Sequence, residues 1–207
     1  MTGKTYLYAQ IDSNNPQNRK IMNEMEKEYY DRFEIKLQDD LLRLCTSYQQ
    51  LDGVLIASED IDGHWNVLGP QYLADAVEQV RDYPIVSVAW AAYLGTGVAW
   101  GWDADWAAVS KAPYQLFYGE QGFDDMDEHI VKDLLGFPLD SQEAAMLENS
   151  IRRCAEHTVA AIRHEQIEPQ SAMAYHIFAR ACKVMYRIGA AMQLKRMHYQ
   201  LEKVQLN

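Results

Sequence analysis

The sequence predicts an all-α fold, a single-domain bundle of five or six helices with long first and last helices. Apolar residues recur at steps of three and four along most of the chain, which is the period of one helix face. The segments between these runs are short and contain Gly, Pro, Asp or Asn, which end helices. With 207 residues, 48% of them hydrophobic, the chain can bury a substantial core. We therefore treat residues 1–207 as one helical domain in which residues 1–18 form a polar lead.

The first helix is expected from near Arg19 to Leu51. Its apolar face consists of nine residues at helical spacing: Met22, Met25, Tyr29, Phe33, Leu37, Leu41, Leu44, Tyr48 and Leu51. The Asp52-Gly53 pair ends this pattern. Residues 54–57 are apolar and short enough for a brief strand or the start of a helix, and residues 58–66 are expected to form a polar loop.

Two helices are expected in the middle of the chain. Gly69-Pro70 is expected to open the first of them, because proline suits the first helical turn, and residues 82–84 end it. Residues 85–108 are apolar on nearly all sides, which predicts a central, buried helix. Three small residues in it are expected to mark a close backbone approach or a break: Thr96, Gly97 and Gly101.

The remaining elements are an aromatic linker and three further helices. The linker contains Tyr114, Phe117, Tyr118 and Phe123, and a short acidic helix follows from residue 124 or 125 to residue 135. Ser141 is a good N-cap for a helix that reaches about residue 165. Glu168-Pro169 is expected to begin the last helix, which runs from about residue 170 to beyond Leu201.

Residues 83–102 carry no formal charge and are long enough to span a bilayer. Three glycines and five aromatic residues dilute their hydropathy, so we expect a core helix and not a membrane span. The N-terminus lacks the apolar run of a secretory signal. The three cysteines are widely spaced among apolar residues, and they form neither a zinc motif nor an even disulfide framework: Cys45, Cys154 and Cys182. We therefore expect a cytoplasmic protein.

The net charge of −11 is unevenly distributed along the chain. Residues 51–140 hold 16 acidic and three basic residues, whereas residues 176–207 hold six basic residues and one acidic residue. An acidic chain does not favour broad nucleic-acid binding, because neutralising phosphates requires an excess of Lys and Arg. The asymmetry indicates either an interaction surface or two segments that face each other in the fold.

The acidic segment Glu59, Asp60 and Asp62 is a weak candidate for a metal site. Alternating carboxylates before Gly63 resemble the opening of a calcium loop, in which hard oxygen ligands converge on one ion. The third alternate ligand and the closing acidic residue of that template are missing. The favoured interpretation is a solvated loop with Asp-Gly turn chemistry.

Four of the five tryptophans lie between residues 90 and 106. The candidate ligand or interface residues are Trp90, Tyr93, Trp100, Trp102, Asp103, Asp105 and Trp106. Aromatic rings beside carboxylates can bind a cationic or sugar-like ligand, and the two aspartates can act as acid and base or hold a divalent metal. The favoured interpretation is that the tryptophans anchor the core or a dimer interface and that the aspartates begin a solvent-exposed helix face.

Basic residues and histidines follow two helix faces. His176, Arg180, Lys183, Arg187 and His198 form a stripe that can bind an anion or an acidic partner. The favoured alternative is that this stripe pairs with acidic elements of the same fold, for which the middle segment has enough carboxylates. His157 and His164, with Arg153 behind them, align on one helix and are interpreted as surface residues.

No nucleotide, haem or zinc motif is present in the chain. Gly95, Gly97 and Gly101 imitate a dinucleotide-binding pattern, but the surrounding segments lack the alternation of strands and helices that this chemistry needs. We therefore expect a cytoplasmic helical binding or interaction module that self-associates as a homo-oligomer. The alternative is an enzyme or ligand-binding protein with a carboxylate-rich, divalent-metal site beside the tryptophans, where a small molecule would bind.

Overall fold

The computed structural model describes residues 16–200, with side chains from residue 23 onward. Six α-helices and no strand occur in that part of the chain: α2 (Pro16–Ser47), α3 (Glu59–Gln79), α4 (Pro84–Val109), α5 (Met126–His129), α6 (Gln142–His164) and α7 (Ala172–Arg196). Three short turns complete the connection between α4 and α6: η1 (Tyr114–Phe117), η2 (Phe123–Asp125) and the π-helical η3 (Ile130–Leu134). The predicted all-α fold with long first and last helices is confirmed.

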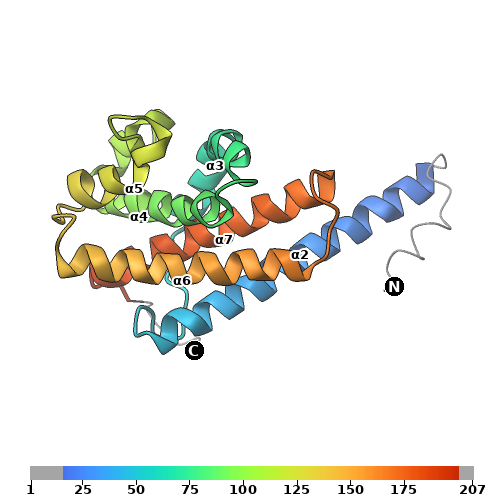
Figure 1. Cartoon of the computed structure of the whole chain (residues 1–207), viewed down its shortest axis with the longest axis horizontal. Helices are drawn as coiled ribbons and strands as arrows, with labels where there is room; N and C mark the ends of the chain where they lie inside the picture. The colour runs from blue at the N-terminus through green and yellow to red at the C-terminus, as the bar shows by residue number, and fades with distance from the viewer. Residues whose placement is uncertain (1–15, 201–207) are drawn as a thin grey trace, which may run out of the picture.

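The centre of the molecule is the pair of helices α4 and α7, which pack along each other. Figure 1 shows α2 and α6 on one side of this pair and α3 and α5 on the other. α2 contacts both α6 and α7, so the first of the described helices lies against the last two. This arrangement buries the apolar residues of α4 on nearly all sides, as its sequence predicts.

The contact between α4 and α7 depends on two glycines. A Cβ atom on Gly95 would lie 1.9 Å from the carbonyl oxygen of Tyr186, and one on Gly189 would lie 1.9 Å from that of Ala92. Only glycine permits two helix backbones to come this close. Gly95 was not among the residues expected to mark this approach.

The small residues that were expected there have other roles. Thr96 is fully buried and its hydroxyl donates to the carbonyl of Ala92, whereas Gly97 and Gly101 face the side chains of Phe117 and Val109. The backbone break in α4 occurs at Asp105, whose φ of −162° and ψ of 83° are not helical.

The sequence-based expectation for residues 58–70 was wrong. Residues 59–66 are not a loop, because α3 begins at Glu59, and Pro70 lies inside this helix instead of opening it. The physical reason is burial: Ile61, Trp65 and Leu68 lie on one helix face that packs in the core. This packing outweighs the cost of Gly63 and Pro70 within the helix.

Other helix ends differ by a few residues from those predicted. α2 ends at Ser47 and not at Leu51, and Gln49 then takes a left-handed φ of 61°. Ser141 caps α6 as predicted, with its hydroxyl accepting from the amide of Ala144 at 3.1 Å. Ser171 caps α7 in the same way, so that helix begins after residues 168–169 and not at them.

The remaining predicted segments are the two ends of the helical part of the chain and two short stretches between helices. α7 ends at Arg196, short of the predicted end beyond Leu201, which lies outside the described residues. Residues 54–57 are neither strand nor helix, and the short acidic helix occurs as α5 and η3. Residues 16–18 of the predicted polar lead belong to α2, whereas residues 1–15 and the side chain of Met22 are outside the described part.

Between residues 16 and 200, no helix combines the length and the apolar character that crossing a membrane requires. The uncharged run at residues 83–102 forms most of α4, and its side chains lie largely in the protein core.

Candidate functional site

The tryptophan-rich segment divides into a buried part and a half-exposed part. Trp90 and Tyr93 lie in the core, where the ring of Trp90 meets that of Phe123 edge-on at 4.6 Å. Trp100, Trp102 and Trp106 are only half-buried. This segment is therefore a core element at one end and a partly exposed aromatic surface at the other.

The fold brings the acidic segment of α3 against these half-exposed tryptophans. The indole nitrogen of Trp102 donates to Asp60 at 3.3 Å, and its ring meets that of Tyr199 at 5.3 Å. The ring of Trp106 contacts His64, whose Nε2 atom is buried and has no hydrogen-bond partner among the described residues. The acidic segment 59–62 and the tryptophan-rich segment 90–106, which were separate candidates in the sequence, are therefore neighbours in space.

The carboxylates near this surface do not converge on one point. Tyr199 donates to Asp103 at 2.6 Å, and Asp105 accepts the backbone amide of Ala108 at 3.1 Å. Asp62 pairs with Arg187, and Glu59 is exposed in the first turn of α3. Within residues 23–200, no group of three His, Cys, Asp or Glu side chains is arranged to hold a metal ion.

The basic stripe of α7 pairs with carboxylates of the same chain. Arg180 bonds to Glu34 and to Asp31, and Lys183 donates to Glu34 at 2.7 Å. Although burial raises the pKa of Glu34, these hydrogen bonds from Lys183 and Arg180 lower it below its ordinary value. The cations of this part of the stripe are therefore already matched by acids of α2.

Arg187, the next cation of the stripe, also pairs with a carboxylate of the same chain, but this carboxylate comes from α3 and not from α2. Arg187 donates to Asp62 at 3.0 Å and also bonds to Gln38. The middle segment, which was expected to supply the carboxylates, contributes Asp62 to the stripe, whereas α2 contributes Asp31 and Glu34. His176 packs against Tyr30, and His198 is exposed beyond the end of α7.

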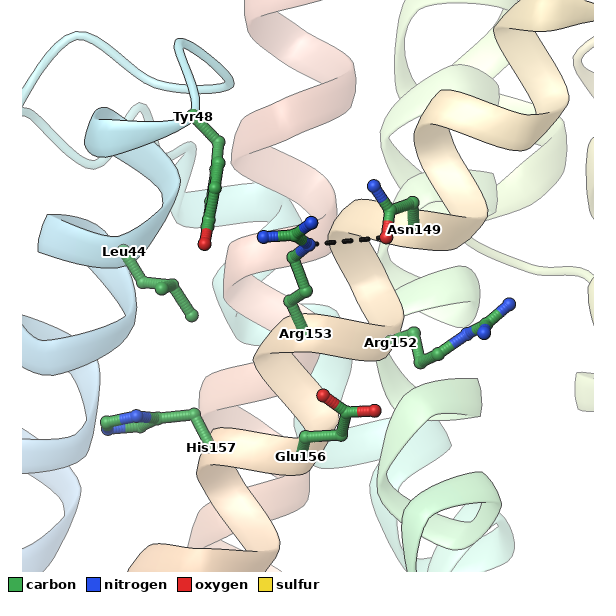
Figure 2. Close-up of a pocket in the computed structure, with 7 residues that line it drawn as sticks. All are labelled: Leu44, Tyr48, Asn149, Arg152, Arg153, Glu156 and His157. Carbon is green, nitrogen blue, oxygen red and sulfur yellow. Dashed lines mark hydrogen bonds between the residues drawn. The ribbon is translucent and has the colours of Figure 1, made fainter.

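A groove lies between α2 and α6, on the face of α6 that carries Arg153 and His157. It encloses about 470 Å³ and is lined by Leu44, Tyr48, Asn149, Arg152, Arg153, Glu156 and His157. Figure 2 shows Leu44 and Tyr48 on the α2 side and Arg153 and His157 on the α6 side, with Arg152 and Glu156 pointing away from α2.

Arg153 is held in this groove by two neighbours. Its Nε atom donates to the side-chain oxygen of Asn149 at 3.2 Å, one helical turn earlier on α6. Its guanidinium lies over the ring of Tyr48, 4.4 Å from the ring centre. Among the described residues, its two Nη atoms have no hydrogen-bond or ion-pair partner.

A second hollow of about 330 Å³ continues along the same two helices. His157 lines both spaces, and His164 lines the second together with Lys36 and Asp40. The Nε2 atom of His157 lies 3.9 Å from a carboxylate oxygen of Asp40. The alignment of Arg153, His157 and His164 was visible in the sequence. The two histidines are exposed as predicted, and Arg153 is exposed as well.

Sequence reasoning did not identify Tyr48 and Asn149 as parts of a site. Tyr48 was assigned to an apolar helix face, but it follows the end of α2 and is 44% exposed. Helical spacing places Asn149 one turn before Arg153, so the contact between these two residues could have been predicted from the sequence. No family model, curated protein or solved structure matches this chain.

Proposed function

We propose that this protein is a cytoplasmic helical binding module whose groove between α2 and α6 holds the oxyanion of a small molecule. The observation that carries the proposal is Arg153, a fixed guanidinium without an acidic partner among the described residues. Arginine is suited to this task because its planar fork of N–H donors matches the oxygens of a carboxylate or phosphate.

Arg153 differs from the arginines and lysine of the α7 stripe, and from Arg152, in having no carboxylate partner among the described residues. Arg180, Lys183 and Arg187 each form an ion pair with a carboxylate of the same chain. Arg152, its neighbour on α6, pairs with Glu148 one turn earlier. Among the described residues, no carboxylate is paired with Arg153, so the oxyanion of a ligand would not have to displace one.

The other walls of the groove indicate the body of the ligand. Tyr48 offers an exposed ring and a hydroxyl group, and Leu44 adds apolar surface beside it. The volume lies within the range of small-molecule sites, which combine apolar walls with a few placed polar groups. These features favour a small carboxylic acid or phosphate monoester, up to the size of a nucleotide, with a flat or apolar body.

The test uses a simple aromatic phosphate, phenyl phosphate, and measures thermal stabilisation of the full chain. A ligand that binds only the folded protein stabilises it by RT ln(1 + L/Kd), where L is the free ligand concentration, so the melting temperature rises with ligand concentration. We expect this concentration-dependent rise in the wild type, and in Arg153→Ala we expect the same rise to require at least tenfold more ligand. Arg163→Ala is the matched control, because it removes an exposed arginine of the same helix outside the groove. An equal loss in both variants, or no rise in the wild type, would contradict the proposal.

Two expectations from the sequence belong to this proposal. The cytoplasmic location is supported by the three cysteines, which are all free thiols in the structure. Self-association is a second proposal, and it is supported by the partial exposure of Trp100, Trp102 and Trp106 at one end of α4. Aromatic residues that keep exposed surface are typical anchors of interfaces.

A further inference from the structure

Two of the cysteines face each other across the helices that form the groove. The Sγ atoms of Cys45 on α2 and Cys154 on α6 are 3.5 Å apart, although 109 residues separate them along the chain. Each residue is 2% exposed. Leu44 and Arg153, the chain neighbours of these cysteines, line the groove, so the thiols lie beside the proposed binding site.

We propose that Cys45 and Cys154 form a redox modification site, in which a low-molecular-weight disulfide converts the two thiols into a disulfide between α2 and α6. A disulfide requires the sulfurs to approach to about 2.05 Å. From the observed 3.5 Å, the two atoms must close by about 1.5 Å, which side-chain rotation and a small helix shift can supply.

The position of Cys45 makes it the first thiol to react. It lies in the last turn of α2, which ends two residues later at Ser47, and residues 46–49 are exposed. Helix ends open more readily than helix centres, so Cys45 can reach an oxidant without global unfolding. The hydrogen bond from Cys154 lowers the pKa of the Cys45 thiol, which favours the reactive thiolate.

The reaction proceeds by two exchanges. The Cys45 thiolate attacks one sulfur of the oxidant, forming a mixed disulfide and releasing one thiolate, which takes up a proton. Cys154 then loses its proton and attacks the Cys45 sulfur, which releases the second small thiol. Overall, two protein thiols lose two hydrogens and two electrons, and one oxidant disulfide becomes two thiols.

Cys182 provides an internal control. It is fully buried on α7, its contact is the carbonyl oxygen of Ser87 at 3.9 Å, and burial raises the pKa of its thiol. Among the described residues, Cys182 contacts no second thiol, and its raised pKa disfavours the thiolate. The hydrogen bond to Cys45 and burial raise the pKa of Cys154 as well, so the feature that distinguishes Cys154 from Cys182 is the neighbouring Cys45 sulfur. We expect Cys182 to remain reduced under conditions that link the other two cysteines.

The bond would close a loop of more than 100 residues and remove much of the freedom of the unfolded chain. Such a link raises the melting temperature of a protein of this size by about 10 °C. The formation of the bond can be tested whether or not the groove binds an anion, because neither its mass nor its thermal effect involves a ligand.

The experiment treats the full chain with oxidised glutathione at pH 8, then unfolds it in denaturant and blocks the remaining thiols, buried ones included, with an alkylating agent. We expect an intact mass lower by two hydrogens before alkylation, a linked peptide containing Cys45 and Cys154, and alkylated Cys182. The melting temperature should rise, and dithiothreitol should reverse the rise. Cys182→Ser should behave like the wild type, whereas Cys45→Ser and Cys154→Ser should form no internal link.

Three results would overturn the proposal. The first is that Cys45 and Cys154 are both alkylated after oxidation, and the second is a glutathione adduct on Cys45 that Cys154 never resolves. The third is a linked peptide that contains Cys182. Because peptide mapping is performed on the wild type, these results hold even if a serine variant fails to fold.

Discussion

The glycine contact between α4 and α7 gives a sharp prediction for Gly189→Ala. The new Cβ would lie 1.9 Å from the carbonyl oxygen of Ala92, whereas real Cβ atoms essentially never come within 3.0 Å of a heavy atom from another part of the chain. The two helices must therefore separate by about 1 Å, because the obstacle is backbone and cannot rotate away.

The magnitude follows from two opposing terms. Overpacking a core costs about 1–3 kcal/mol, and a backbone clash between two buried helices places this case at about 3 kcal/mol. Alanine recovers about 1 kcal/mol through its higher helix propensity. The net loss in the free energy of unfolding is therefore about 2 kcal/mol, which lowers the melting temperature of a chain of this length by about 4–8 °C.

Urea denaturation followed by circular dichroism measures this loss. Gly63→Ala is the matched control, since Gly63 lies within α3 and a Cβ there would meet nothing within 4 Å. We expect this control to gain about 0.5–1 kcal/mol from helix propensity alone. The double variant Gly95→Ala/Gly189→Ala should lose less than the sum of its parts, because the first change already separates the helices. A Gly189→Ala protein as stable as the wild type would refute the close packing of α4 on α7.

Two further predictions concern charge and assembly. Glu34→Gln should cost about 2 kcal/mol at pH 7, because it leaves Arg180 and Lys183 without their shared carboxylate. The difference in the free energy of unfolding between wild type and variant should shrink as the pH falls below 4.5, the ordinary pKa of a Glu side chain. Below that pH the unfolded wild-type chain binds a proton that the folded Glu34 carboxylate, with its lowered pKa, still excludes. Urea titrations at several pH values measure this difference, and a constant value would contradict the prediction. Replacing Trp100 and Trp106 together by alanine should lower the molar mass measured by light scattering if these rings form a self-association surface. An unchanged molar mass in a variant with a native circular dichroism spectrum would exclude that surface.

Local signals were enough to predict most helices of this fold. Ser141 caps α6 because its hydroxyl meets an amide three residues on, and this interaction needs no information from elsewhere in the chain. The start of α3 could not be read in this way. Gly63 and Pro70 are locally unfavourable in a helix, and only the burial of Trp65 and its neighbours against the rest of the core outweighs them.

In the candidate site, neighbours on one helix could be predicted from the sequence, but contacts between helices could not. The alignment of Arg153 and His157 follows from helical spacing, and so does the position of Asn149. Tyr48 could not be added, because the sequence does not state which helices pack together. The approach of Cys45 to Cys154 was hidden for the same reason, since it depends on the contact between α2 and α6.

The pairing of α2 with α7 has a consequence for the protein during its synthesis. Glu34 and its partner Arg180 are 146 residues apart, and a ribosome that adds about 5–20 residues per second needs roughly 7–30 s to make the second after the first. Throughout that interval Phe33, Leu37 and Leu41, which lie in the core of the finished fold, have no completed core to enter. A nascent chain halted before α7 should therefore expose an apolar helix that chaperones recognise.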